Sequence, residues 1–223
     1  MWNPTIGHIT AEARFIVPDL PGHDHSADQT YRSHDQTVSE LVDLIEKDAS
    51  AQMAVVGFSL GAQLAVLLAS RRPDLVDRVA VVSAQAKPSR APVLTLSLLA
   101  ATAGLAKNNW FAKQQAKALS IPAGLMPDYL RTSSSLSKQT LLAAVGDNMR
   151  FSPPPEWTRF SGISAIFAGE RERDVIKDSA QLLHNALRGS QLAIVDGCGH
   201  GIPFQRPKWF AERIRTWLSE PPT

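Results

Sequence analysis

Val-Val-Gly-Phe-Ser-Leu-Gly-Ala, residues 55–62, is the stretch from which the fold can be predicted. The apolar run 52–56 ends in β-branched residues, which predicts a strand, and Gly57 interrupts it. From Gly61 onward the chain is rich in Ala and Leu, which predicts a helix. Ser59 therefore stands at an abrupt corner between a strand and a helix.

The spacing Gly57-x-Ser59-x-Gly61 is typical of a nucleophile elbow, a tight turn that holds a serine above the edge of a sheet. We expect glycine on both flanks because such a corner leaves no room for side chains two residues either side. The free N–H groups of the helix start could then stabilise an oxyanion. The alternative is a tight turn whose serine has no chemical role.

Strands alternate with helices along most of the chain, which predicts an α/β fold: a mostly parallel sheet with helices on both faces. Besides 52–56, the predicted strands are 14–17, 79–83, 163–168 and 191–195. The predicted helices are 36–47, 60–70, 175–187 and one that opens at Pro207. Residues 88–157 contain only short helical stretches and follow the third predicted strand. We therefore expect a core made of 1–87 and 158–223, with a helical insertion at 88–157.

The composition is that of an ordinary globular chain, with 223 residues, 44% apolar and 20% charged. A net charge of +2 gives no reason to expect nucleic acid or an anionic membrane as a partner. The single cysteine, Cys198, excludes an internal disulfide and fits a reducing compartment. Residues 1–10 lack a secretory signal, and the apolar stretch 91–106 is short for a membrane span. We expect a cytoplasmic location.

His200 lies between glycines in Gly-Cys-Gly-His-Gly, directly after a predicted strand. Because parallel strands end at one edge of a sheet, this imidazole could accept the proton of Ser59. The alternative is a loop histidine with a single structural hydrogen bond. An acid that orients the imidazole should also follow a strand. The turn after 163–168 offers three carboxylates for that place: Glu170, Glu172 and Asp174.

With these motifs the chain resembles the α/β-hydrolase fold superfamily, of the esterase and meta-cleavage-product hydrolase kind. The resemblance spans almost the whole chain and rests on four stretches: Val-Pro-Asp-Leu-Pro-Gly-His (17–23), Gly-Phe-Ser-Leu-Gly (57–61), Gly-Glu-Arg-Glu (169–172) and Gly-Cys-Gly-His-Gly (197–201). The resemblance implies that Ser59 is the nucleophile and His200 the general base. It also implies Glu172 as the acid, with Asp174 as the alternative, and the Leu60 N–H as an oxyanion donor. The helical insertion would be the family's cap.

The chain departs from the family at its start, which corresponds to family sequence just beyond a His-Gly motif. The resemblance therefore implies that the opening strands, that motif and a second oxyanion donor are absent. Either a fragment or a naturally short protein fits this reading. The missing strand would lie between 14–17 and 52–56, so we expect these two stretches to pair directly in its place.

A second departure places Asp24 where the family has glycine, among His23, His25, His34 and Asp35. Adjacent residues seldom point at one ion, so we expect neither a metal nor any other cofactor. The expected function is a serine hydrolase that cleaves an ester or related acyl bond of a small apolar substrate. The alternatives are a catalytically silent small-molecule-binding protein and a C–C bond hydrolase. An exposed sheet edge would favour a homodimer.

Overall fold

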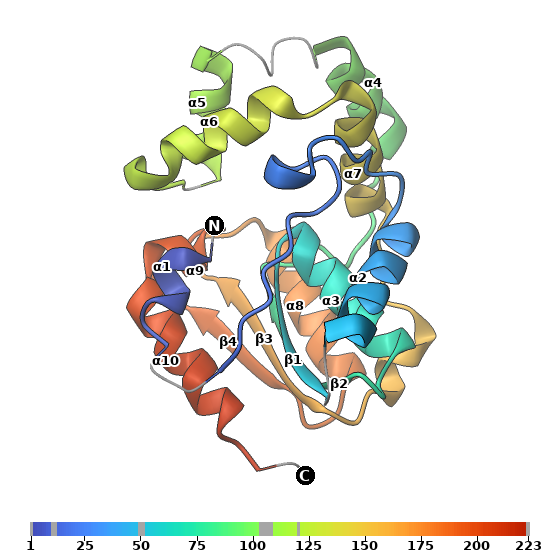
Figure 1. Cartoon of the computed structure of the whole chain (residues 1–223), viewed down its shortest axis with the longest axis vertical. Helices are drawn as coiled ribbons and strands as arrows, with labels where there is room; N and C mark the ends of the chain where they lie inside the picture. The colour runs from blue at the N-terminus through green and yellow to red at the C-terminus, as the bar shows by residue number, and fades with distance from the viewer. Residues whose placement is uncertain (1, 10–12, 49–51, 103–108, 120, 222–223) are drawn as a thin grey trace.

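The computed structural model describes residues 2–9, 13–48, 52–102, 109–119 and 121–221. Its centre is a parallel sheet whose strands follow one another in the order β1-β2-β3-β4. The strands are β1 (Met53–Phe58), β2 (Val76–Val82), β3 (Ile163–Gly169) and β4 (Gln191–Val195). Because all four run the same way, their carboxyl ends share one rim of the sheet, as the prediction of an α/β fold requires (Figure 1).

Helices cover both faces of this sheet. One apolar cluster joins alternate residues of β2 and β3 to α2 (His34–Asp48), α3 (Leu60–Arg71), α8 (Asp174–Ala186) and the short η4 (Pro155–Arg159). The other residues of the same strands pack on α10 (Pro207–Leu218), near α1 (Asn3–Ile6) and α9 (Ile202–Gln205). This alternation explains why the strands read as continuous apolar runs, since both faces are buried.

A group of helices follows β2 and lies beyond the carboxyl rim of the sheet (Figure 1). It consists of α4 (Pro92–Thr102), α5 (Asn109–Ala118), η3 (Ala123–Leu125), α6 (Met126–Ser135) and α7 (Lys138–Arg150). Ser137 caps α7 by accepting a hydrogen bond from the Thr140 N–H. In the described part of the chain, every helix is too short or too polar to span a bilayer.

The prediction of a strand at residues 14–17 is wrong. Residues 13–20 form an irregular extended segment, and β2 is the only strand partner that β1 has among the described residues. The segment runs beside β1 in Figure 1, but two cavities of about 420 and 400 Å³ lie along it. Residues of the segment and residues of β1 line both of these cavities. The pairing that we expected between 14–17 and 52–56 is therefore absent too.

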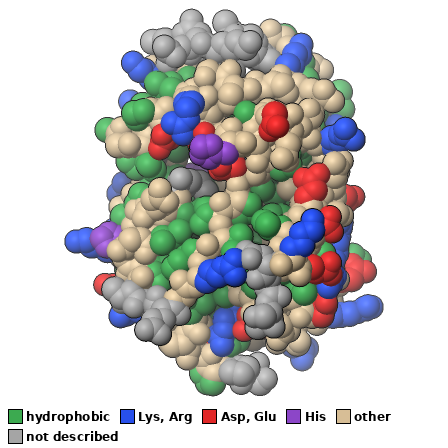
Figure 2. Space-filling model, viewed as in Figure 1, with side chains coloured by type: hydrophobic (Ala, Val, Ile, Leu, Met, Phe, Trp, Pro, Cys, Tyr) green, Lys and Arg blue, Asp and Glu red, His purple; other side chains and the backbone are tan. Residues whose placement is uncertain are grey.

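The anchors of this segment explain why it stays away from β1. Earlier in the chain, Trp2 stacks on Phe210 of α10, with ring centroids 6.4 Å apart. After its end, Gly22 packs against Thr140 of α7. Strands that share hydrogen bonds must lie about 4.8 Å apart, and the segment runs between its anchors with open space on the β1 side. Hydrophobic side chains gather at the centre of this face of the molecule (Figure 2).

Candidate active site

Ser59 occupies the corner between β1 and α3. Its backbone has φ 55° and ψ −117°, a conformation that is strained for a residue with a side chain. The Ser59 N–H donates to the Val82 carbonyl of β2 at 2.8 Å, which fixes the corner to the neighbouring strand. The turn therefore presents the Ser59 side chain at the carboxyl rim, beyond the last residue of β1.

Of the two glycines that flank this corner, only Gly57 is required by space. A Cβ atom on Gly57 would lie 2.3 Å from the Gly61 carbonyl oxygen and 2.6 Å from the Ala62 Cα. A Cβ atom on Gly61 would meet no atom within 4 Å. The expectation that both flanks exclude side chains is therefore wrong for Gly61, because its Cα faces the cavity that lies along β1.

His200 lies in the loop between β4 and α9, with its Nε2 3.0 Å from the Ser59 Oγ. The ring packs against Phe58 at a centroid distance of 5.1 Å. A close approach between this loop and the end of β3 holds it in place. The Arg171 N–H donates to the Cys198 carbonyl at 2.8 Å, and a Cβ atom on Gly169 would lie 2.4 Å from that same oxygen.

Glu172 completes a chain of hydrogen bonds that begins at Ser59. Its Oε2 lies 3.1 Å from the His200 Nδ1, and its side chain is 1% exposed. The Nδ1–H of His200 donates to this carboxylate, which leaves Nε2 free to accept the Ser59 hydroxyl proton. The Oε1 of Glu172 accepts from the Gly169 N–H at 3.2 Å and from the Ser83 hydroxyl at 2.5 Å.

The other two carboxylates of the same turn point elsewhere. Glu170 accepts a hydrogen bond from the Gly197 N–H at 2.7 Å, and so ties the two loops together. Asp174 opens α8, is 91% exposed and pairs with Lys177 at 3.0 Å. Of the two acids considered for the site, Glu172 is the one that the structure brings to His200.

Glu172 is buried, yet its hydrogen bonds stabilise the negative charge of the carboxylate. Burial by itself raises the pKa of a carboxyl group. The hydrogen bonds from His200 and Ser83 outweigh that effect and hold the pKa of Glu172 below its ordinary value. The site therefore keeps an ionised carboxylate behind the imidazole, as an imidazole that takes up a proton requires.

A cavity of about 400 Å³ opens beside Ser59 and runs along β1. Ser59 and Leu60 line it together with His23 and a set of apolar side chains from β1, α2 and α3. Leu60 is the first residue of α3, where a backbone N–H has no partner within its own helix. Leu94 and Leu98 of α4 do not line this cavity and are 64% and 61% exposed.

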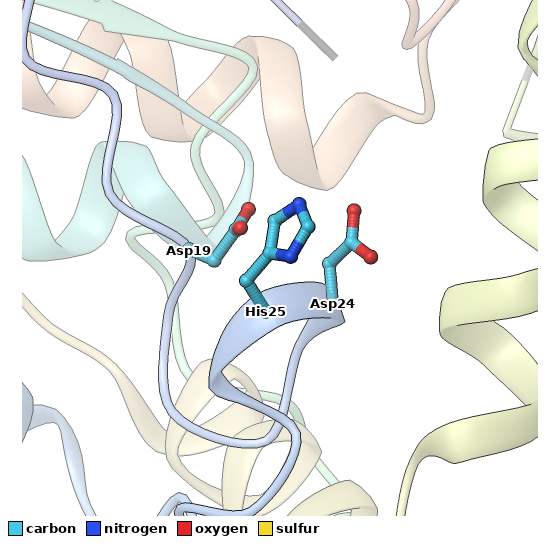
Figure 3. Close-up of side chains that lie close together, drawn as sticks. All are labelled: Asp19, Asp24 and His25. Carbon is cyan, nitrogen blue, oxygen red and sulfur yellow. The ribbon is translucent and has the colours of Figure 1, made fainter.

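The residues considered for a metal do not come together as one group. His34 is buried against Tyr31 and Gln63, whereas Asp19, Asp24 and His25 offer ligand atoms within 4.8 Å of one another (Figure 3). The Asp24 carboxylate already accepts hydrogen bonds of 3.1 and 2.9 Å from Arg131 of α6. This pair joins the loop after residue 20 to the helical group and holds the pKa of Asp24 below its ordinary value.

Two features of the site are not evident from the sequence. Ser83 follows β2 as Ser59 follows β1, yet a serine after a strand is too common to mark a function. The cavity beside β1 depends on the irregular path of residues 13–20. The sequence pattern of 14–17 predicted a strand there, and so gave no sign of a cavity. The only usable signal was the position of Ser83 at the same rim as the three candidate residues.

Comparison with known proteins agrees with this architecture. A family model described as the alpha/beta hydrolase family matches residues 1–213. A pimeloyl-[acyl-carrier protein] methyl ester esterase of Vibrio campbellii is 31% identical over 87 residues, which are 39% of this chain and 33% of that protein. The chain thus spans a third of the length of that relative. The monoacylglycerol lipase abhd6-A of Xenopus laevis is 22% identical over 98% of this chain and 71% of its own length.

Solved structures share the fold at low sequence identity. The enol-lactonase of Burkholderia xenovorans superimposes with a TM-score of 0.82 at 18% identity, over 98% of this chain and 86% of that one. The family model covers nearly all of the sequence, and the parallel sheet and the strand-to-helix corner agree with it. The chain belongs to the alpha/beta hydrolase family.

Proposed function

We propose that the protein is a serine hydrolase that cleaves an ester or a related acyl bond. The observation that carries the proposal is the continuous series of hydrogen bonds from Ser59 through His200 to the buried Glu172, at 3.0 and 3.1 Å. A serine hydroxyl, an imidazole and a carboxylate in this order form the arrangement that activates a serine for attack on a carbonyl carbon.

In the proposed reaction Ser59 Oγ attacks the substrate carbonyl while the Nε2 of His200 takes up the hydroxyl proton. Glu172 stabilises the imidazolium that forms, and the Leu60 N–H at the start of α3 donates to the developing oxyanion. The imidazolium then gives its proton to the leaving alcohol, and an acyl group remains on Ser59. Water, activated by the same imidazole, releases that acyl group and regenerates the hydroxyl.

An apolar acyl group is the substrate class that fits the cavity beside Ser59. Most of the lining is aliphatic, with Leu41, Leu44, Ile45 and Leu64 on the side of α2 and α3. Relatives named as a methyl ester esterase and a monoacylglycerol lipase support an ester as the scissile group. Residues 88–157 act in this proposal as a cap over the rim of the core formed by 1–87 and 158–223, the Arg131–Asp24 pair being one contact between them.

A series of p-nitrophenyl esters from acetate to octanoate tests the proposal. We expect p-nitrophenol release by the wild-type protein, a rate that rises with the length of the acyl chain, and no release by Ser59→Ala. Ser70→Ala is the matched control because Ser70 is a buried serine within α3 that donates to the Val66 carbonyl. If the folded protein binds these esters without turning any of them over, it is a small-molecule-binding protein instead.

A further inference from the structure

We propose that Ser83 is a positioning residue of this site, whose hydroxyl fixes the Glu172 carboxylate so that its second oxygen faces His200. The inference rests on the proposed serine hydrolase function and adds a fourth side chain to it. Ser83 itself is not in hydrogen-bond contact with Ser59, so its effect on the reaction passes through Glu172 and His200.

The hydrogen-bond geometry shows which acceptor takes the Ser83 proton. Ser83 Oγ lies 2.5 Å from the Glu172 Oε1 and 3.3 Å from the His200 carbonyl oxygen. A hydroxyl has one proton to donate, and the shorter distance assigns it to the carboxylate. Ser83 is 1% exposed, so water does not compete for either group. The bond is therefore a buried hydrogen bond to a charged acceptor, which is the strong kind.

The two oxygens of Glu172 have separate tasks as a result. Oε1 accepts from Ser83 and from the Gly169 N–H, whereas Oε2 accepts from His200. Two donors at fixed positions define the rotation of the carboxylate plane. When Ser83 is removed, Oε1 keeps the longer bond from the Gly169 N–H at 3.2 Å, and the carboxylate is held less firmly against the imidazole.

The backbone at Ser83 is held in a conformation that serves this contact. Its φ is +56°, in the left-handed region that non-glycine residues seldom adopt, and Ser59 has φ +55°. The Ser83 N–H still donates to the Phe167 carbonyl of β3 at 2.8 Å, as a residue of the sheet would. The chain then turns at Ser83, at the position next to Val82, which pairs with Phe58 just before Ser59. Strain of this kind persists where surrounding contacts fix it, and it clusters at functional sites.

Two substitutions separate the effect of the Ser83 hydroxyl from the effect of its strained backbone. Ser83→Ala removes the hydroxyl and keeps the strained φ, whereas Ser83→Gly removes the hydroxyl and relieves the strain. With the best p-nitrophenyl ester we expect both variants to lose about ten- to a hundredfold in kcat, with KM changed by less than about twofold. The acid limb of the pH–rate profile should move to higher pH, because Glu172 without this hydrogen bond takes up a proton more readily.

Thermal unfolding distinguishes positioning from a purely structural role. Both variants should stay folded at the assay temperature, with Ser83→Gly unfolding at a higher temperature than Ser83→Ala because it relieves the strain, and both should still show the loss of kcat and the shifted acid limb. The inference is overturned if Ser83→Ala and Ser83→Gly keep the wild-type kcat and pH profile, or if both lose activity only by unfolding. If the wild-type protein and the Ser70→Ala control hydrolyse no ester at all, the proposed function fails instead.

Discussion

Gly57 and Gly61 lie on opposite sides of Ser59, and the backbone of one blocks any side chain on the other. The space that a Cβ atom of Gly57 would need is taken by the Gly61 carbonyl oxygen, 2.3 Å away, whereas a Cβ atom of Gly61 meets open space. The tight corner therefore requires glycine at position 57, two residues before the serine. Position 61, two residues after the serine, has room for a Cβ atom.

Gly57→Ala and Gly61→Ala form a matched pair that tests this asymmetry. Gly57→Ala should lower the free energy of unfolding by roughly 1–3 kcal/mol, since the backbone of α3 must move away from the new methyl group. Gly61→Ala should leave it unchanged or raise it by up to about 1 kcal/mol, because alanine favours the helix. Urea denaturation of both variants measures the difference. Equal effects at the two positions would contradict the geometry of the corner.

Glu172→Gln should remove most of the activity that we propose, while Asp174→Asn should not. The amide keeps the shape of Glu172 but carries no charge to stabilise the imidazolium, so we expect kcat to fall by on the order of 10²- to 10⁴-fold. Asp174 is exposed and pairs with Lys177, away from His200. Steady-state ester hydrolysis by the two variants decides between them. A larger loss in Asp174→Asn would show that Asp174, and not Glu172, is the acid of the site.

His34 makes the stability of the fold depend on pH. Burial lowers the pKa of His34 below 6.5, although the Gln63 hydrogen bond and the charges of Asp147 and Asp35 act in the other direction. The unfolded chain therefore binds a proton at His34 at a higher pH than the folded chain does. The free energy of unfolding should fall as pH drops below 6.5, and level off once the pH passes the lowered pKa of the folded state.

Denaturation of His34→Gln at several pH values between 7 and 5 checks this. The variant should lack part of the slope, whereas His8→Gln should keep the wild-type slope because His8 is exposed. An unchanged slope in His34→Gln would show that other groups cause the pH dependence.

The cavity beside β1 should set the preferred length of the acyl chain. Leu41 of α2 lines this cavity, and Leu41→Trp would fill part of it. We expect hydrolysis of p-nitrophenyl octanoate to fall by about tenfold relative to acetate, which corresponds to a loss of roughly 1.4 kcal/mol of apolar contact. Ratios of kcat/KM for the two esters measure this. An unchanged ratio would place the acyl chain elsewhere.

The sequence predicted most of the fold because its signals are local. The apolar runs that became β1, β2, β3 and β4 each lie within a few residues of their predicted bounds, and Pro207 opens α10 as expected. The three candidate residues could be named because strand ends in a parallel sheet share one rim.

Residues 14–17 show where local signals fail. Their composition favours a strand, but a strand exists only with a partner within hydrogen-bond distance. The packing of Trp2 on Phe210 and of Gly22 on Thr140 sets their path instead. The role of Ser83 depends likewise on a contact with Glu172, 89 positions away in the chain, which no local pattern encodes.

The central claim is that Ser59 is a nucleophile activated by His200, and covalent labelling with a fluorophosphonate probe tests it most directly. Intact-mass and peptide analysis should show one probe on Ser59 of the folded wild-type protein. Ser59→Ala should not be labelled, and His200→Ala should be labelled far more slowly. A folded wild-type protein that stays unlabelled, or labelling that persists in Ser59→Ala, would contradict the account.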